Sequence, residues 1–550
     1  MTPAELSAVV LAAARACVEA GEFAAELPAE AALERPKNPE HGDFATNLAL
    51  RLAKGAGRPA REIAEAIANR LRTSEGVARV DVAGPGFLNI TLAADALGEI
   101  ARTIVQTGSS FGRVADLAGL RINLEFVSAN PTGPVHLGHT RWAALGDSLH
   151  RILEAAGADV VAEHYINDFG SQMTKFAASL YAAAREQPIP EDGYHGDYVA
   201  DVAKQIVAER PDVLDAPADA ALAVFAAEGE RLMVHGLRES LARFGVEFDV
   251  WRSERSLHES GEVAAALARL REQGHVFEEG GAVWLRTTDF GDDKDRVLVR
   301  SGGELTYFAS DAAYYLDKRS RGFDKCVYML GADHHGYVGR LKAIVACAGD
   351  DPTQTIEVLI GQLVKLMRGD EELRLSKRAG TIVTLDEFVE LVGVDAGRYS
   401  LARWSADTPL TLDIAEITKR SNDNPVYYVQ YAHARTCNAK RNAADVGIGL
   451  DVFVPELLTS PFEATLLTAL SEFPRVVATA AELRAPHRVA RYLEDLASAY
   501  HRWYDECRII PKGDEPITDV NRTRAWVNDA TRIVLAGGLD LLGVSAPERM

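Results

Sequence analysis

Two histidines in the motif HLGH, His136 and His139, are placed for joint chemistry because they lie three residues apart at a predicted strand-to-helix turn. Residues 121–126 alternate polar and apolar side chains, as a strand does, and the Pro/Gly-containing run 128–134 ends that strand. Apolar residues then recur at helical spacing up to residue 153. A helix N-terminus binds phosphate through its unpaired N–H groups and the positive end of its dipole.

The two imidazoles could donate hydrogen bonds to phosphate oxygens as charge develops in a transition state. Gly138 between them has no Cβ, so a flat ring or a phosphate can approach the backbone closely. The same spacing also suits a structural histidine pair at a helix start, or half of a metal site. The pattern alone leaves these three interpretations open.

A second candidate for phosphate binding is the basic, glycine-containing stretch LRLSKRAGT, residues 373–381. Lys377 could meet a polyphosphate as a mobile cation, and Ser376 could hydrogen-bond to it. Taken alone, such a stretch is more typical of a solvated surface loop.

Polar clusters follow three of the predicted strands, at the point where each strand ends. They are residues 125–130, 167–172 after a strand at 158–166, and 333–335 after a buried strand at 325–330. A further strand is expected at 355–360. In open parallel sheets ligands bind at the carboxyl ends of the strands, where the strand order reverses, so we expect these clusters to form one site.

The overall composition excludes some classes of protein and favours others. The length of 550 residues suggests about three or four domains, and the absence of a run of about 18 apolar residues predicts no membrane span. The acidic N-terminal segment resembles an amphipathic helix rather than a signal peptide. The net charge of −21 argues against non-specific nucleic-acid binding, although local basic patches could still grip a nucleic acid. Five scattered cysteines indicate neither a disulfide framework nor a zinc site, so a reducing cytoplasm is expected.

The patterns divide the chain into three parts. Residues 1–112 are predicted to form an α+β domain with helices at 2–20 and 58–75 and a hairpin of strands 77–83 and 87–93. Asp43 is a candidate helix cap there. Phe87 and Asn89 could contact an unpaired base, although a half-buried strand residue is the more usual state of such a phenylalanine.

Residues 113–400 are predicted to hold the parallel sheet, with an insertion at about 186–300 that is helix-rich up to residue 268 and β-rich at 276–307. Residues 401–550 have helical patterning throughout. A core face is expected at Val489, Leu493, Leu496, Tyr500, Trp503, Tyr504 and Cys507. Arginines interleave with aromatic residues in this part, as at Tyr427, Tyr431 and Arg435, and stacking plus cations suits single-stranded RNA loops. Singly, each of these residues is more typical of packing or of a solvated surface than of RNA binding.

The order of these motifs along the chain resembles that of a known enzyme family. HLGH at a strand-to-helix turn, LSKR more than 200 residues later and a helical C-terminal part resemble a class I aminoacyl-tRNA synthetase. Within that class, the chain resembles the arginyl-tRNA synthetases in several stretches: EFVSANPTGPVHLGH, INDFGSQ, TDFGDDKDRVLVRSGGELTYFASDAAYYLDK, GADHHGY, NPVYYVQYAHAR and LGVSAPERM. Arg374 stands where the family's KMSKS motif has its first lysine, whereas Ser376 and Lys377 match.

The resemblance implies a multidomain α/β fold: an N-terminal domain that touches tRNA, a Rossmann-type catalytic domain with an insertion, and an all-helical anticodon-binding domain. It implies an arginine pocket of Glu125, Asn130, Tyr307, Asp311 and His334. The chemistry agrees, because a guanidinium presents five fixed donors and is best met by paired carboxylates, here Glu125 and Asp311. Asn130 and the pair Asp333–His334 could then take the ammonium and carboxylate groups of the substrate.

The resemblance further implies that the arginine carboxylate attacks the α-phosphate of ATP, and that the arginyl group passes to the 2′-hydroxyl of the terminal adenosine of tRNA(Arg). His136, His139 and Lys377 would be catalytic, and ATP would bind at these three residues and at Gly138, Ser376 and Arg378, with Mg²⁺ carried by ATP and no metal held by the protein. Phe87 and Asn89 would approach the D-loop of the tRNA. Tyr427, Tyr431, His433 and Arg435 would lie on the anticodon side. The expected partners are tRNA(Arg), L-arginine and ATP, with no membrane, and the expected state is a monomer.

Two other functions compete with this one. In a metal-dependent phosphoesterase, Asp333, His334 and His335 together with His136, His139 and Asp168 would hold two divalent ions. A catalytically inactive tRNA-binding protein would bind tRNA without activating an amino acid. The retained His136, His139, Ser376 and Lys377 argue against the inactive protein, since a scaffold has no use for them.

Overall fold

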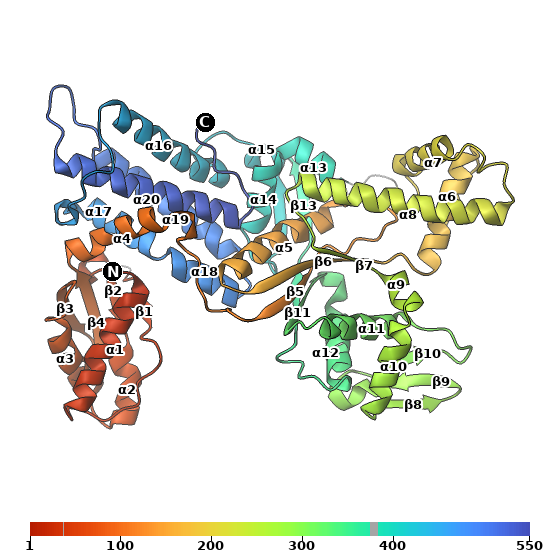
Figure 1. Cartoon of the computed structure of the whole chain (residues 1–550), viewed down its shortest axis with the longest axis horizontal. Coiled ribbons are helices and arrows are strands. Elements are labelled where there is room, and N and C mark those ends of the chain that lie inside the picture. Colours follow the sequence, from red (N-terminus) through yellow and green to blue (C-terminus); the bar gives the residue numbers. More distant parts are fainter. Residues whose placement is uncertain (37, 374–382) are drawn as a thin grey trace.

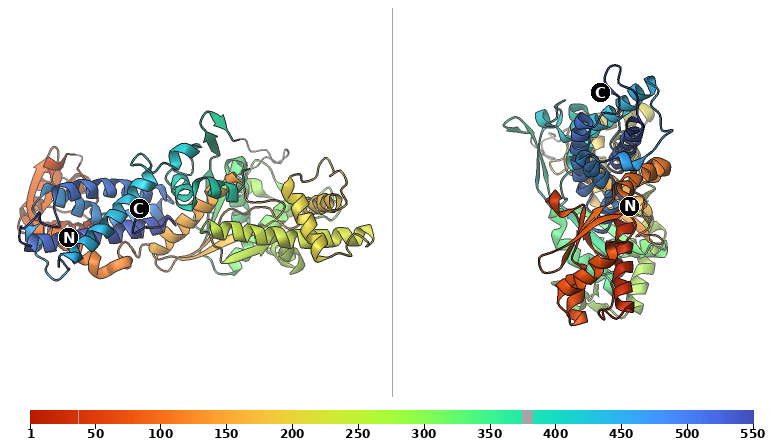
Figure 2. Two further views of the ribbon diagram at one scale, coloured as in Figure 1. Left: turned by 90° about the horizontal axis from the view of Figure 1, so that it is seen from above. Right: turned by 90° about the vertical axis from the view of Figure 1, so that its left-hand side faces the viewer.

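The computed structural model describes residues 1–36, 38–373 and 383–550. The molecule is elongated, with an N-terminal unit at one end, a helical bundle beside it, and a sheet with its insertions towards the other end (Figures 1 and 2). The predicted stretch 373–381, apart from Leu373, lies outside the described residues.

The N-terminal unit packs helices on one antiparallel sheet of order β1-β2-β4-β3. Thr2 caps the first helix in a capping box with Glu5. The predicted hairpin is confirmed as the antiparallel pair of β3 and β4. The elements are α1 (Pro3–Glu19), β1 (Leu33–Glu34), β2 (Phe44–Thr46), α2 (Leu48–Ala56), α3 (Ala60–Leu71), β3 (Val77–Ala83), β4 (Phe87–Leu92) and α4 (Ala94–Thr107).

The prediction that Asp43 caps a helix is wrong. The carboxylate of Asp43 accepts a hydrogen bond from Leu92 N (2.8 Å) and thereby fastens the start of β2 to the end of β4. The helix begins only at Leu48, after Asn47, whose side chain makes no capping bond. The sequence pattern missed β2 because three residues are too few to show a period.

The central sheet has five parallel strands in the order β12-β11-β5-β6-β7. The chain starts in the middle at β5, moves outward through β6 and β7, and returns to the other side of β5 through β11 and β12. The strand order therefore reverses between β5 and β11, which is where ligands bind in such sheets. The strands are β5 (Arg121–Glu125), β6 (Asp159–Ile166), β7 (Val250–Ser253), β11 (Lys325–Gly331) and β12 (Ile356–Gly361), and the helices between them include α5 (Leu137–Ala155), α11 (Tyr307–Ser320) and α12 (Val338–Cys347).

The predicted insertion is interrupted by a strand of the central sheet, because β7 pairs in parallel with β6. The helices before β7 form a projecting subdomain, and those after it pack with a small antiparallel sheet of order β10-β9-β8 (Figure 1). The elements are α6 (Ser171–Ala184), α7 (Asp197–Glu209), α8 (Ala218–Arg243), α9 (Glu254–Glu259), α10 (Glu262–Glu272), β8 (Val276–Glu279), β9 (Ala282–Leu285) and β10 (Arg296–Val299).

Residues 401–550 are helical except for the strand β15, which the sequence did not predict. β15 pairs in parallel with β13, a strand that precedes residue 401. Val489, Leu493, Leu496, Tyr500 and Trp503 are fully buried, as the helical spacing predicted, and Cys507 is buried as well. The strands are β13 (Val364–Arg368), β14 (Glu371–Glu372) and β15 (Leu410–Asp413), and the helices are α13 (Leu385–Val392), α14 (Val394–Ala402), α15 (Ile414–Ile417), α16 (Pro425–Asp445), α17 (Pro461–Ser471), α18 (Phe473–Glu482), α19 (His487–Glu506) and α20 (Asp519–Leu541).

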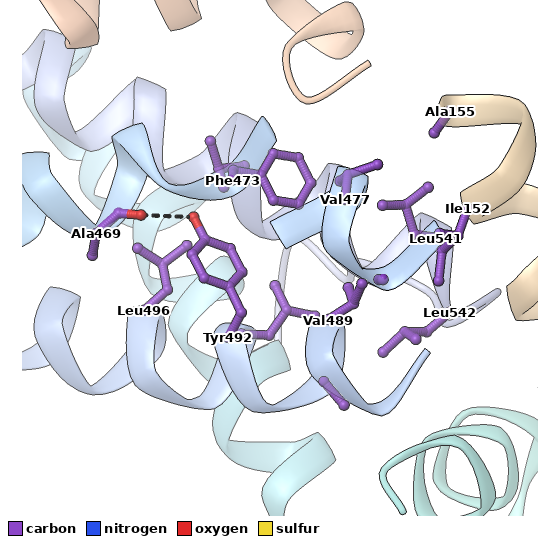
Figure 3. Close-up of a cluster of buried hydrophobic side chains, with 14 of the residues drawn as sticks. Ile152, Ala155, Ala469, Phe473, Val477, Val489, Tyr492, Leu496, Leu541 and Leu542 are labelled. Carbon is purple, nitrogen blue, oxygen red and sulfur yellow. Dashed lines mark hydrogen bonds between the residues drawn. The ribbon is translucent and has the colours of Figure 1, made fainter. Parts of the chain in front are cut away.

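The helical part and the sheet share one hydrophobic core. Figure 3 shows Ile152 and Ala155, from the end of α5, beside Val477 and Leu541 of the bundle. Within the bundle, the Tyr492 hydroxyl donates to Ala469 O over 3.0 Å, so even this buried polar group is satisfied. The helix that begins at the HLGH motif is therefore held by both parts of the molecule.

Candidate active site at the carboxyl edge of the central sheet

The HLGH turn has the geometry that the sequence predicted. His136 is the N-cap of α5, and its Nδ1 accepts a hydrogen bond from Gly138 N over 3.2 Å. The rings of His136 and His139 stack, with centroids 4.0 Å apart and planes 26° apart. A Cβ on Gly138 would lie 3.0 Å from His136 Cε1, so any larger residue there would press against the ring that folds back over the turn. Both imidazoles thus stand at the positive end of a 19-residue helix.

The segment that follows the undescribed residues 374–382 is hydrogen-bonded to this turn. Leu137 N donates to Val383 O (3.1 Å), and Leu385 N donates to Val135 O (2.8 Å), so that His136 and Thr384 form an isolated antiparallel bridge. Thr384 then starts α13 with a capping box. The HLGH turn is therefore connected by backbone hydrogen bonds to residues 383–385. Ser376, Lys377 and Arg378 of the second predicted stretch lie outside the described residues.

Glu125, at the end of β5, is already paired. Its Oε2 lies 2.5 Å from the ammonium of Lys318, and its Oε1 accepts from Ser128 Oγ over 3.0 Å. Lys318 is fully buried and lies over the rings of Tyr314 and Tyr328, at 4.2 and 3.8 Å from their centroids. Because the buried cation of Lys318 balances the charge of Glu125, the pair has little net charge. Glu125 can therefore accept further hydrogen bonds from a ligand, but it contributes little net negative charge.

Asp311, on the first turns of α11, is the carboxyl group that carries the unusual electrostatics. The Tyr337 hydroxyl donates to its Oδ2. Burial raises the pKa of Asp311 to about 8, and the negative charges of Glu254 and Glu125 add to this rise. Burial likewise raises the pKa of Glu254 to about 7. Because the surroundings disfavour the negative charge of these acids, a bound cation would stabilise their ionised form.

These acids surround one tyrosine. Burial raises the pKa of the Tyr165 hydroxyl, and four carboxylates raise it further, in the order Glu254, Asp311, Glu125 and Asp168. The acids come from β5, α9, α11 and the loop after β6. The carboxyl edge of the sheet thus gathers acidic side chains from segments that are far apart in the sequence.

The other three predicted pocket residues lie at the rim. Asn130 is exposed, Tyr307 is 58% exposed at the start of α11, and His334 stands in the turn after β11 with its Nε2 3.5 Å from Asp333 Oδ2. The predicted pocket residues therefore divide into two inner acids, Glu125 and Asp311, and three exposed polar groups.

Sequence reasoning missed several residues of this site. Lys318, Ser128, Tyr165, Glu254 and Tyr337 all contact or face the predicted acids. Lys318 could have been found, because it follows Asp311 by seven residues and so lies on the same face of the helix. Glu254 gave no signal, since it belongs to a short helix beside an unpredicted strand.

The residues predicted to contact tRNA are placed unevenly. Phe87 is 39% exposed at the start of β4, but Asn89 is buried within the strand, so the expectation that both are exposed is wrong for Asn89. Strand alternation alone does not reveal this, because Asn89 points to the same side as Phe87, but Asn89 lies opposite Ala45 of β2 and Asp81 of β3 in the interior of the sheet.

On α16, Tyr427 and Tyr431 stack in parallel, with centroids 6.2 Å apart. The Arg435 guanidinium lies 4.5 Å from the centroid of the Tyr504 ring, and its Nη1 lies 3.0 Å from His501 Nδ1. His433, in contrast, is buried, with Nδ1 2.9 Å from Pro547 O, and burial lowers its pKa. Three of the four residues thus form an accessible aromatic and cationic face, and His433 instead secures the C-terminal segment.

The metal site required for a phosphoesterase is not assembled. Within residues 1–36, 38–373 and 383–550, no group of three or more His, Cys, Asp or Glu side chains could hold a metal ion. Asp168 is occupied elsewhere, since its carboxylate accepts from Ser253 Oγ and from Arg255 N (2.9 Å) at the start of α9. In the same described part of the chain, no helix combines the length and apolar character needed to cross a bilayer.

Known proteins similar to this chain match it along its whole length. The family models that match are "Arginyl tRNA synthetase N terminal domain" at residues 5–92, "tRNA synthetases class I (R), catalytic domain" at 114–397 and "DALR anticodon binding domain" at 429–550. The arginine–tRNA ligase of Kineococcus radiotolerans is 59% identical and that of Frankia alni 57% identical, each with 100% of both chains covered. Among solved structures, a putative arginyl-tRNA synthetase from Campylobacter jejuni matches with a TM-score of 0.76 at 30% identity, covering 84% of this chain and all of its own. The Thermus thermophilus arginyl-tRNA synthetase matches with a TM-score of 0.75 at 24% identity over 100% of both chains.

Proposed function

This chain belongs to the arginyl-tRNA synthetase family and ligates arginine to tRNA, and on that premise we propose that arginine activation takes place at the carboxyl edge of the central sheet. Two observations carry the proposal: a histidine-capped helix N-terminus follows β5, and the acids Asp311 and Glu254, whose pKa values burial raises, face Glu125 at the end of the same strand. The first suits the phosphates of ATP and the second suits a guanidinium.

In the activation step, an oxygen of the arginine carboxylate attacks the α-phosphorus of ATP. The new bond forms as the bond from that phosphorus to the bridging oxygen breaks, and pyrophosphate leaves with the electron pair. His136 and His139 donate to the phosphate oxygens, and Gly138 lets ATP approach the turn. Ser376, Lys377 and Arg378 are assigned to the same phosphates from the sequence. No protein nucleophile is needed, because positioning and electrostatics supply the rate.

We assign Mg²⁺ to ATP rather than to the protein, since the described residues offer no group of three ligands for it. When bound to the phosphates, the ion reduces their negative charge during the displacement.

Arginine selectivity follows from the two inner acids. Asp311 supplies the charge that pairs with the guanidinium, and Glu125, fixed by Lys318 and Ser128, supplies an oriented acceptor. Asn130, Tyr307 and His334 at the rim are assigned to the ammonium and carboxylate of the substrate. Lysine cannot make the bidentate contact and citrulline lacks the charge, and each unmet buried hydrogen bond costs about 1–3 kcal/mol.

The tRNA is proposed to lie along the elongated molecule, with tRNA(Arg) as the partner. Phe87 on the N-terminal unit and Tyr427, Tyr431 and Arg435 on α16 are the accessible contacts, whereas Asn89 and His433 are buried and are not assigned to tRNA. The 2′-hydroxyl of the terminal adenosine then takes the arginyl group from the adenylate. We retain the division into residues 1–112, 113–400 and 401–550, and we propose a monomer that works in the cytoplasm.

The experiment that tests this function is ATP–pyrophosphate exchange with each of the twenty amino acids, with and without tRNA. We expect that arginine is the only one of the twenty amino acids that supports exchange. We also expect that this exchange requires tRNA. Binding of tRNA without any exchange would instead identify a catalytically inactive tRNA-binding protein. Release of phosphate from a phosphoester with no dependence on arginine would identify a phosphoesterase.

A further inference from the structure

The turn that joins β5 to the HLGH region is held in a strained conformation. Val127 and Ser128 have φ values of 66° and 41°, in the left-handed region that glycine prefers. For a β-branched valine this conformation is a genuine outlier. Such strain persists only where surrounding contacts impose it, and it concentrates at functional sites.

Three consecutive residues of β6 impose the conformation of this turn. Glu163 O accepts from Phe126 N (3.4 Å), and Tyr165 N donates to Ser128 Oγ (3.1 Å). Between them, the Nε2 of His164 accepts from Ala129 N (3.2 Å). Glu163 and Tyr165 contact the turn through backbone atoms, which a substitution does not remove. His164 contacts it through its side chain, so a substitution of His164 can remove this hydrogen bond.

The turn carries two residues of the proposed arginine pocket. Ser128 Oγ donates to Glu125 Oε1, so the orientation of that carboxylate depends on the conformation at Ser128. Asn130 directly follows Ala129, whose N–H donates to His164. Movement of Ala129 would therefore shift an inner acid and a rim residue together.

The ring of His164 is built into the protein as an acceptor. It is fully buried, stacks on Trp251 (centroids 4.3 Å apart, planes 20° apart) and meets the edge of Phe248 at 5.3 Å. On the far side, the Arg238 guanidinium lies 4.7 Å from the centroid of the Trp251 ring. Burial lowers the pKa of His164 to about 3, so the imidazole stays neutral and one ring nitrogen remains free to accept.

We propose that His164 is a positioning residue for arginine recognition, which fixes Ala129 through its Nε2 and so keeps Glu125 and Asn130 in their binding arrangement. The inference rests on the proposed arginine pocket and adds to it a residue that touches no substrate. It also gives a function to β7, whose Trp251 holds the ring in place.

The test compares aminoacylation kinetics of four variants, with arginine and ATP varied separately. His164→Leu keeps much of the volume but has no acceptor, and His164→Gln places an amide oxygen near the position of Nε2. His164→Asn has an acceptor of the same kind that ends near Nδ1, too short to reach Ala129. Phe248→Leu is the matched packing control, because it loosens the contact with the same ring and leaves the acceptor intact.

We expect His164→Leu and His164→Asn to raise the KM for arginine about tenfold or more, because a buried N–H loses its acceptor. The kcat and the KM for ATP should stay within about threefold of the wild type, and His164→Gln should recover most of the arginine KM. If His164→Leu does not fold, the Gln and Asn variants still decide the question. Hydrogen exchange of the peptide that contains Ala129 should rise in the Leu and Asn variants alone.

Glu125→Gln separates failure of this inference from failure of the pocket. If Glu125→Gln raises the arginine KM while all three His164 variants behave like Phe248→Leu, the positioning role is wrong and the pocket remains. If Glu125→Gln leaves the arginine KM unchanged, the pocket assignment itself is wrong, and the positioning proposal falls with it.

Discussion

Arginine binding to the free enzyme should release a proton, because Asp311 must ionise to pair with the guanidinium. Burial and two neighbouring acids raise the pKa of Asp311 to about 8. An acid is neutral below its pKa, so at pH 7 the empty pocket holds Asp311 mainly in its protonated form. The bound cation favours the carboxylate, and the proton therefore leaves as arginine enters.

The magnitude follows from the pKa. With a value of about 8, roughly one Asp311 in eleven is ionised at pH 7, so about 0.9 proton is released per arginine bound. The dissociation constant for arginine should weaken about fifteenfold between pH 8 and pH 6.5, since the ionised fraction falls by that factor. Glu254, whose pKa is about 7, acts in the same direction.

Isothermal titration calorimetry in two buffers of different ionisation enthalpy measures the protons directly, and repetition from pH 6.5 to 8 gives the affinity profile. Asp311→Asn is the control, since its affinity should be weak and should keep only the shallower pH dependence that Glu254 contributes. A wild-type affinity that stays flat, with no difference in heat between buffers, would refute the assignment of Asp311 as the charge partner of the guanidinium. Staying below pH 8 limits the contribution of the substrate's own amino group.

Three further predictions concern other parts of the molecule. His139→Ala should lower adenylate formation by roughly two or more orders of magnitude in pyrophosphate exchange, with tRNA binding on filters close to wild type. Arg398→Met should cost about 3–5 kcal/mol in urea unfolding because it leaves Asp147 buried without its main partner, whereas Arg151→Met, which removes a partly exposed partner of the same acid, should cost far less. Phe87→Ala should weaken tRNA binding by about 1–3 kcal/mol without changing the KM for arginine, and Phe290→Ala, an equally exposed ring in the insertion, should change neither.

The sequence predicted best those elements whose own residues determine them. The alternation of residues 121–126 and the helical spacing up to residue 153 predicted β5 and α5 within a residue or two. The core face of α19 followed from the same periodicity. These patterns are local, so one chain suffices to find them.

What the sequence did not predict depends on residues that meet only in the fold. β7 has four residues and lies between helices, so no period identifies it, yet it completes the sheet and holds the ring of His164. Asn89 has the sequence position of an exposed residue but is buried in the interior of the N-terminal sheet, between β2 and β3. The neutralisation of Glu125 by Lys318 joins residues 193 positions apart, and no local rule connects them.

A buried arginine connects the catalytic helix to the C-terminal end of the chain, which explains why the helical part and the sheet form one core. Arg398 on α14 pairs with Asp147 of α5 and donates to Leu542 O (3.1 Å) after α20 and to Phe244 O (3.0 Å) after α8. Gly543 has a φ of +62°, and a Cβ there would collide with the guanidinium, so the chain can pass Arg398 only as glycine. One side chain thus joins the HLGH helix, the insertion and the helical bundle.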